Sequence, residues 1–167
     1  TSSEKLMQLL QSRLAVRIIK VTKNNVQGNW KNFIRDIDTL IINIPPAKKD
    51  KAKENYEFQL KQIADRCDSS LKVIFVSSTS VYGNNSLIAS EDSPTRPSKT
   101  SGNQVLAAER IIQAHFGSNA AIVRFAGLFG PDRHPGRFLK ANTALVNPNG
   151  KINLIHLEDC IALITAI

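Results

Sequence analysis

The stretch VIFVSSTSVYG, residues 73–83, decides the fold class of this chain. It begins with an apolar run rich in β-branched residues, which is typical of a strand that is buried on both faces. It ends in hydroxyl residues and a V-Y-G turn. A strand of this kind belongs to a parallel sheet, and its polar end lies at the carboxyl edge, where open α/β sheets bind ligands.

Other strand-like runs alternate along the chain with longer amphipathic stretches. The full set of expected strands is 16–21, 39–44, 73–77, 121–125 and 151–155. Helical patterns cover 1–11, 50–67, 101–116 and 160–167, and the first of them opens with the capping box T-S-S-E. This alternation predicts βαβ crossovers, and therefore an α/β fold with a Rossmann-like, doubly wound parallel sheet.

Length and composition indicate one domain over residues 1–167, because 42% of the residues are hydrophobic and can form a real core. No apolar stretch reaches the roughly 18 residues of a membrane helix, and there is no signal peptide. Cys67 and Cys160 have no metal-ligand neighbours in the sequence, which favours a reduced cytoplasm and argues against a metal site.

The net charge of +8 does not by itself identify a partner, because basic proteins bind nucleic acids, anionic cofactors or neither. The main run of charge is the lysine-rich segment 48–53, which has no interleaved aromatic residues. We interpret it as a solvated helix face. The sequence therefore predicts a cytoplasmic protein that binds neither nucleic acid nor membrane.

Both ends of the sequence favour an internal piece of a longer protein. Thr1 lies inside a helix cap without an initiator methionine, and Ile167 ends an apolar helix-like run. A complete small domain with an unusual start is the alternative. No G-x-G-x-x-G motif occurs, and the nearest feature, GLFG at 127–130, lacks the third glycine and is predicted to be a loop.

Five motifs occur in an order that identifies a family resemblance. They are DTLIINIPP at 38–46, VIFVSSTSVYG at 73–83, AAER at 107–110, VRFAGLFGP at 123–131 and NLIHLEDC at 153–160. In this order they resemble the extended short-chain dehydrogenase/reductases, which include NAD(P)-dependent sugar epimerases and dehydratases. The resemblance begins after the second strand of that fold. It implies that the first two strands, the glycine motif and most of the substrate-binding part lie outside this sequence.

The resemblance implies a dinucleotide, NAD or NADP, at the carboxyl edge of the sheet. The residues expected to contact it are Asn43, Pro45, Ser77, Ser78, Phe125 and Gly127. Pro45 also suits an ordinary corner between a strand and a helix. The hydroxyls of Thr1, Ser2 and Ser3 at a helix N-terminus favour a phosphate, and so favour NADP slightly over NAD.

The same resemblance places the catalytic hydroxyl at Ser78 and exposes a departure from the family. The family's Tyr-x-x-x-Lys pair falls on Ser101 and Val105. A lysine cation on the same helix face lowers the pKa of that tyrosine, and valine supplies no charge. We therefore expect an atypical member whose proton-transfer residue is lost or relocated.

Two other side chains could supply the proton. Tyr82 lies near the same sheet edge, although a tyrosine packed beneath the loop is the plainer interpretation. His134 lies in the loop PDRHPGR, and a histidine side chain can serve as a proton donor near neutral pH. Arg133 and Arg137 of that loop could bind an anionic substrate group, because the guanidinium matches carboxylate and phosphate. An exposed basic loop is the alternative.

Two functions remain open. The first is an NAD(P)-dependent oxidoreductase or epimerase that acts on a small, anionic, sugar-nucleotide-sized substrate. The second is a non-catalytic NAD(P)-binding sensor or scaffold, which the altered pair at Ser101 and Val105 favours. The resemblance also implies a possible homodimer, formed through helices 50–67 and 101–116.

Overall fold

The computed structural model describes residues 17–21, 26–46, 55–83, 88–138 and 150–167. Its centre is a parallel sheet of three strands, in the order β3 (Thr39–Ile42), β4 (Lys72–Ser78) and β5 (Ala120–Phe125). Since β4 is paired on both sides, its apolar run is the central strand of this sheet.

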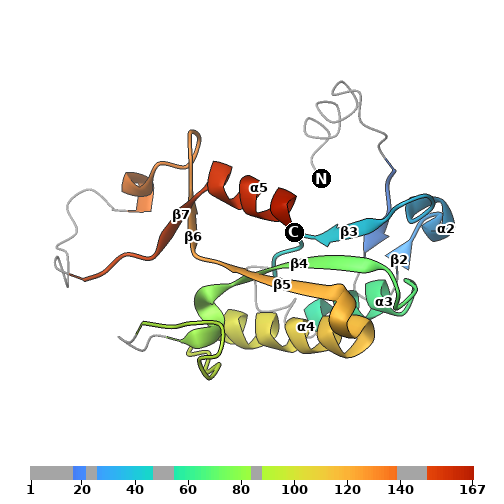
Figure 1. Ribbon diagram of the computed structural model, residues 1–167, viewed down its shortest axis with the longest axis horizontal. Helices are drawn as coiled ribbons and strands as arrows, with labels where there is room; N and C mark the ends of the chain where they lie inside the picture. Colours follow the sequence, from blue (N-terminus) through green and yellow to red (C-terminus); the bar gives the residue numbers. More distant parts are fainter. Residues whose placement is uncertain (1–16, 22–25, 47–54, 84–87, 139–149) are drawn as a thin grey trace.

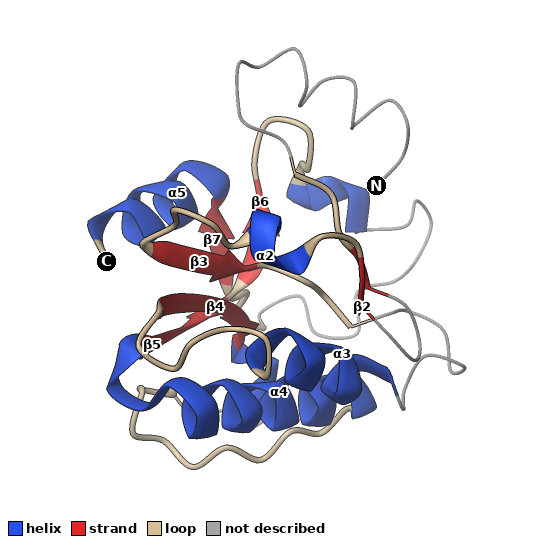
Figure 2. Cartoon of the chain, turned by 90° about the vertical axis from the view of Figure 1, so that its right-hand side faces the viewer, coloured by secondary structure: helices blue, strands red, loops and turns tan. Residues whose placement is uncertain are grey.

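Helices lie on both sides of the sheet (Figure 1). α3 (Asn55–Ala64) and α4 (Thr100–Phe116) pack side by side beneath it, whereas α5 (Leu157–Ala166) lies on the other side (Figure 2). The expected α/β architecture, with a parallel sheet between helices, is confirmed. The described part of α3 is shorter than the expected helix over 50–67, and residues 50–54 lie outside the described part.

The hydrophobic core lies between β4 and the pair α3–α4. Leu60 of α3, Phe75 of β4 and Ile112 of α4 are completely buried there. Alternation along β4 explains the packing, because Val73 and Phe75 point to the helices, whereas Ile74 and Ser78 fall on the opposite face. Burial of each large apolar side chain contributes about 1.5–3 kcal/mol.

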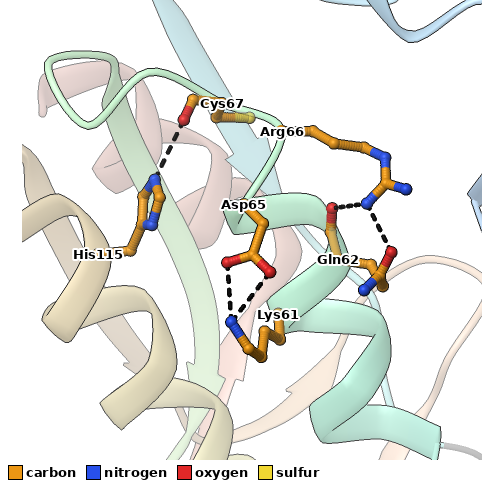
Figure 3. Close-up of polar contacts among 6 residues, drawn as sticks. All are labelled: Lys61, Gln62, Asp65, Arg66, Cys67 and His115. Carbon is orange, nitrogen blue, oxygen red and sulfur yellow. Dashed lines mark hydrogen bonds and ion pairs between the residues drawn. The ribbon is translucent and has the colours of Figure 1, made fainter.

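A hydrogen bond links the C-terminal end of α4 to the chain that follows α3 (Figure 3). This contact lies toward the amino ends of the strands, away from their carboxyl ends. A ring nitrogen of His115 lies 3.1 Å from the carbonyl oxygen of Cys67. On α3, the Lys61 ammonium donates hydrogen bonds to both carboxylate oxygens of Asp65 at 3.0 and 2.9 Å. Burial raises the pKa of the Cys67 thiol to about 11, so this cysteine is protonated at neutral pH.

The expected strand at 16–21 does not join the main sheet, so this prediction is wrong. Only β1 (Lys20–Val21) is a strand there, and it pairs antiparallel with β2 (Val26–Gln27). A short helix, α2 (Trp30–Phe33), follows, and the indole Nε1 of Trp30 donates to the carbonyl of Arg66 at 2.8 Å. Val21 packs against the edge of the core, whereas Ile18 is exposed, and only Lys20 and Val21 have strand partners.

The segment GLFG at 127–130 is a strand rather than the predicted loop. β6 (Gly127–Phe129) pairs parallel with β7 (Leu154–His156), which begins three residues later than the expected strand at 151–155. An added Cβ at Gly127 would lie 2.8 Å from Leu154 Cδ2 and 3.1 Å from the carbonyl oxygen of Asn153. Glycine therefore allows close pairing of the two strands, which a local pattern does not reveal.

The remaining boundaries agree with expectation to within a few residues. The strand expected at 39–44 ends two residues earlier, at Ile42. The strand expected at 73–77 is one residue longer at each end, and the strand expected at 121–125 begins one residue earlier. The helix expected at 101–116 begins at Thr100. The apolar run 160–167 belongs to α5, which starts earlier because the His156 side chain caps it, accepting from the Glu158 amide at 3.3 Å. Helix 1–11 and the whole lysine-rich segment 48–53 lie outside the described residues.

Short 3₁₀ turns complete the described chain: η2 (Thr79–Tyr82), η3 (Gly117–Asn119) and η4 (Pro135–Phe138). Among the helices of the described residues, none combines the length and the apolar character needed to cross a membrane.

Tyr56 ties α3 to the chain that leaves β3. Its hydroxyl donates to the carbonyl oxygen of Ile44 at 2.7 Å, and its side chain is buried. Burial raises the pKa of this hydroxyl to about 12. The neutral hydroxyl therefore stabilises the fold below its unfolded pKa of about 10, and this contribution is lost as the pH rises toward 12.

We predict that Tyr56→Phe lowers the free energy of unfolding near neutral pH by about 0.5–1.5 kcal/mol, the usual net contribution of one hydrogen bond. Urea unfolding of both proteins near neutral pH and at about pH 11 measures the difference. It should shrink at the higher pH, because only the wild type has a buried phenol to ionise. A difference independent of pH would contradict this assignment.

Candidate functional site

The carboxyl ends of β3, β4 and β5 lie next to one another, as the sequence predicts. In the register of the sheet, Ile42 is the partner of Phe75, and Ser78 is the partner of Phe125. The chain that follows β3 carries Asn43 and Pro45, both of which are exposed. The hydroxyl end of β4 is thus flanked by the two segments that the sequence assigned to a cofactor.

Ser78 ends β4 and starts the η2 turn. It is half-buried, and its Oγ accepts a hydrogen bond from the Ser80 amide at 3.2 Å. Because an Oγ that accepts one bond still has its own hydrogen to donate, Ser78 can donate to a bound ligand. Its side chain falls on the face of the sheet opposite α3 and α4, alongside Phe125.

Ser77 points to the other face and has a different role. Its side chain is buried, and its Oγ donates to the carboxylate of Glu109 on α4. A side-chain contact with a ligand at the opposite face is therefore ruled out in this arrangement. What remains possible for the predicted cofactor contact at Ser77 is its backbone.

Tyr82, at the end of η2, is held by Arg124 of β5. Nη1 of Arg124 donates to the Tyr82 hydroxyl at 2.6 Å, and the guanidinium lies 4.9 Å from the centroid of the ring. The same guanidinium forms a bidentate ion pair with Glu109, at 2.9 and 2.8 Å. The hydrogen bonds to Glu109 raise the pKa of Arg124, which stays charged.

Asn153 is a site residue that the sequence interpretation missed. It precedes β7, and its Nδ2 donates to Oγ1 of Thr79 at 3.4 Å, while its carbonyl oxygen accepts from the amide of Gly127 at 3.1 Å. An amide side chain therefore lies beside the residue that follows Ser78. Its position as the first residue of the motif NLIHLEDC was the available signal, but only the parallel pairing of β6 and β7 brings it to this edge.

Ser101 and Val105, the two positions where the sequence interpretation expects the family's Tyr-x-x-x-Lys pair, lie in the first turns of α4. Ser101 is exposed, whereas Val105 is buried with 6% of its surface accessible. A buried valine cannot supply the cation that assists a tyrosine in the family. The intervening Gly102 packs against η2, since an added Cβ would lie 2.9 Å from the carbonyl oxygen of Ser80 and 2.9 Å from Pro97 Cβ.

The basic loop after β6 has its own internal structure. Gly130 and Arg133 exchange backbone hydrogen bonds at 3.4 and 3.0 Å, and Nδ1 of His134 accepts from the Gly136 amide at 3.1 Å. Arg133 and His134 are exposed, and Gly130 lies against Leu157 in the first turn of α5. The side chain of Arg137 lies outside the described part. The contacts described for His134 do not join it to Ser78.

The side chains at the sheet edge are neutral hydrogen-bonding groups: the Ser78 and Thr79 hydroxyls and the Asn43 and Asn153 amides. Hydroxyls and amides suit the ribose and carboxamide of a nicotinamide nucleoside better than they suit a metal ion. Across the described ranges, no group of three or more His, Cys, Asp or Glu side chains could hold a metal. The donor set therefore fits the nicotinamide half of a dinucleotide.

Comparison with known proteins agrees with the motifs. The family model for the NAD dependent epimerase/dehydratase family matches residues 48–159, which is more than half of the chain. Protein YeeZ of Escherichia coli K12 is 38% identical over 137 residues, a match that covers 79% of this chain and 48% of YeeZ. The chain thus spans about half the length of the curated relatives that it matches.

Solved structures share the fold. UDP-glucuronic acid 4-epimerase from Bacillus cereus, in complex with UDP-glucuronic acid and NAD, superposes with a TM-score of 0.63 at 21% identity, over 83% of this chain and 52% of that one. A protein of unknown function from Silicibacter pomeroyi gives a TM-score of 0.58 at 25% identity, over 80% of this chain and 48% of that one.

We predict that Gly102→Ala destabilises the protein by about 1–3 kcal/mol, because the new methyl group meets the backbone of Ser80. In a helix, replacing glycine with alanine ordinarily raises stability by about 0.5–1 kcal/mol. A loss of stability in Gly102→Ala would therefore show that position 102 lies too close to Ser80 for a methyl group. The exposed neighbour Ser101→Ala serves as the control and should change stability by less than about 0.5 kcal/mol. Thermal unfolding measures both variants, and a stabilised Gly102→Ala protein would contradict the prediction.

Proposed function

This chain belongs to the NAD dependent epimerase/dehydratase family, and we propose that it binds NAD across the carboxyl edge of β3, β4 and β5. The observation that carries the proposal is the meeting of three strand ends at one edge, with hydroxyl and amide side chains around Ser78. The solved relative from Bacillus cereus is itself a complex with NAD, which supports the choice of cofactor.

The residues proposed to hold the nicotinamide half are the six assigned from the sequence, together with Asn153. In this proposal, Asn43 and Pro45 contact one side of the nicotinamide half after β3, and Phe125 and Gly127 contact the other side at the end of β5. Ser78 and Asn153 offer a hydroxyl and an amide between these two sides, and Ser77 contributes its backbone only. When bound, NAD supplies the hydride acceptor or donor of the reaction.

We propose a substrate of the sugar-nucleotide class, a small anionic molecule. UDP-glucuronic acid is bound by the relative from Bacillus cereus, and the exposed Arg133 offers this chain a fork for such an anion. Ser78 donates a hydrogen bond to a substrate hydroxyl or carbonyl and so orients it. Arg137 is the second proposed contact for the anionic group.

Proton transfer is the step in which this chain departs from its family. With Ser101 and Val105 in place of the Tyr-Lys pair, the general acid–base group has to be another residue, and such a group contributes about 10²–10⁴ in rate. Tyr82 is one candidate, because its hydroxyl accepts from Arg124 and retains a hydrogen to donate. His134, exposed in the basic loop, is the other.

The second candidate function is an NAD(P)-binding sensor or scaffold that does not turn over substrate. The burial of Val105 and the exposure of Ser101 favour it, since nothing replaces the family's cation on that helix. The slight preference for NADP depends on Thr1, Ser2 and Ser3, which lie outside the described residues. The binding experiment below therefore includes NADP as well as NAD. A homodimer through α3 and α4 and a cytoplasmic location remain parts of the proposal.

We predict that the full-length protein binds NAD, or NADP, in calorimetry at concentrations up to about millimolar. Ser78→Ala should weaken binding by about two- to tenfold, the loss of one hydrogen bond, while Ser78→Thr, which keeps the hydroxyl, should bind nearly as well as the wild type. Ser118→Ala, an exposed serine of η3, is the matched control.

The same variants separate the two functions. Cofactor oxidation and reduction are followed against a panel of sugar nucleotides, with Tyr82→Phe and His134→Ala alongside Ser78→Ala. Turnover by the wild type that falls in one of these variants supports the enzyme, whereas dinucleotide binding without turnover supports the sensor. If neither dinucleotide binds, both functions are refuted.

A further inference from the structure

One ion pair, whose carboxylate is buried and whose guanidinium is partly buried, contacts both ends of the turn that carries Ser78. Glu109 projects from α4 with only 4% of its surface accessible, and Arg124 reaches it from β5. The pair is bidentate, with both carboxylate oxygens engaged at 2.9 and 2.8 Å. It therefore fixes the position of α4 relative to β5 by geometry as well as by charge.

The remaining hydrogen bonds of this pair go to the turn. On one side, Ser77 Oγ donates to Oε1 of Glu109, immediately before Ser78. On the other side, Nη1 of Arg124 donates to the Tyr82 hydroxyl, and the guanidinium lies over the Tyr82 ring. The segment from Ser78 to Tyr82 is thus held at its beginning and at its end by the same charged pair.

Between these two anchors the turn has little freedom to move. Ser78 caps it by accepting from the Ser80 amide, and the Ser80 carbonyl lies against Gly102 of α4, where even a methyl group does not fit. Gly83, which follows Tyr82, has φ of +78° and lies so close to the carbonyl of Arg96 that a Cβ is excluded. Each contact restricts the position of the turn that begins at Ser78.

We propose that Glu109 and Arg124 are positioning residues, which determine the position of Ser78 at the ligand edge through their bonds to Ser77 and Tyr82. The inference rests on the proposed function, because it gives these residues a role in binding the same dinucleotide. Neither residue touches the ligand. Tyr82, in this role, acts through its contact with Arg124.

A purely structural role for the ion pair is the competing explanation. Buried ion pairs often contribute little to stability compared with apolar residues of the same volume, because desolvation offsets the attraction between the charges. A structural role would use the bonds to Ser77 and Tyr82 to satisfy the remaining hydrogen-bonding groups of the pair, whereas a positioning role also requires that these bonds determine where Ser78 lies. The two explanations differ in what a mild variant does to binding.

The test compares Tyr82→Phe with Ile63→Val in the full-length protein. Tyr82→Phe removes the hydroxyl that accepts from Arg124 and keeps the ring beneath the guanidinium. Ile63→Val removes one methylene from the buried core at α3, away from the hydrogen bonds of the turn. Melting temperature and the dissociation constant for NAD are measured for both variants.

We expect Tyr82→Phe to raise the dissociation constant by about two- to tenfold, and by no more than Ser78→Ala does, while Ile63→Val leaves it unchanged. The double variant Ser78→Ala/Tyr82→Phe should bind no more weakly than Ser78→Ala alone, because Tyr82 acts through the placement of Ser78. Arg124→Lys keeps the positive charge but loses the planar guanidinium that binds Glu109 and Tyr82 together. It should weaken binding at least as much as Tyr82→Phe does.

The outcomes are distinguishable. If the wild type binds neither NAD nor NADP, the proposed function fails, and the positioning role fails with it. If the wild type binds and Ser78→Ala weakens binding, but Tyr82→Phe binds like the wild type or adds fully to Ser78→Ala, the positioning role alone is overturned. If Arg124→Lys does not fold, as judged by circular dichroism, the result for Tyr82→Phe alone decides whether the positioning role holds.

Discussion

The central strand β4 is hydrogen-bonded to β3 on one side and to β5 on the other, and the arrangement of the site follows from this parallel register. Parallel strands end at the same edge, so the chain after Ile42, the hydroxyls after Val76 and the segment after Phe125 converge there. The large core beneath β4, centred on Phe75, holds the register, because a slip of one residue would turn that ring toward the opposite face.

Alternation along β4 separates two kinds of chemistry. Ser77 and its register partner Arg124 lie on the face toward α4, where Glu109 satisfies both of them in a buried network. Ser78 and its partner Phe125 lie on the other face, where the hydroxyl is half-buried and able to meet a ligand. Adjacent serines thus face a hydrogen-bonded network and the proposed ligand edge respectively, and the two-residue period of a strand is the physical cause.

Much of the fold was predictable, because the signals behind it are local. The apolar runs at β3, β4 and β5 and the helical stripes of α3 and α4 are strong periodic patterns. The predictions failed where pairing depends on a distant segment. GLFG was predicted to be a loop, yet it pairs with residues 154–156 as β6, and the run at 16–21 was assigned to the sheet, yet only Lys20–Val21 forms a strand, in a separate hairpin.

The sequence by itself determined the α/β class, the family resemblance and the absence of a tyrosine and a lysine at positions 101 and 105, since each of these depends on residue types in order. Only the tertiary structure decided that Tyr82 bonds to Arg124, that one carboxylate serves both Ser77 and Arg124, and that Asn153 reaches Thr79. These contacts join residues 15 to 74 positions apart in the chain, and no local pattern encodes them. They exist because parallel pairing and the packing of α4 bring the separate segments to one place.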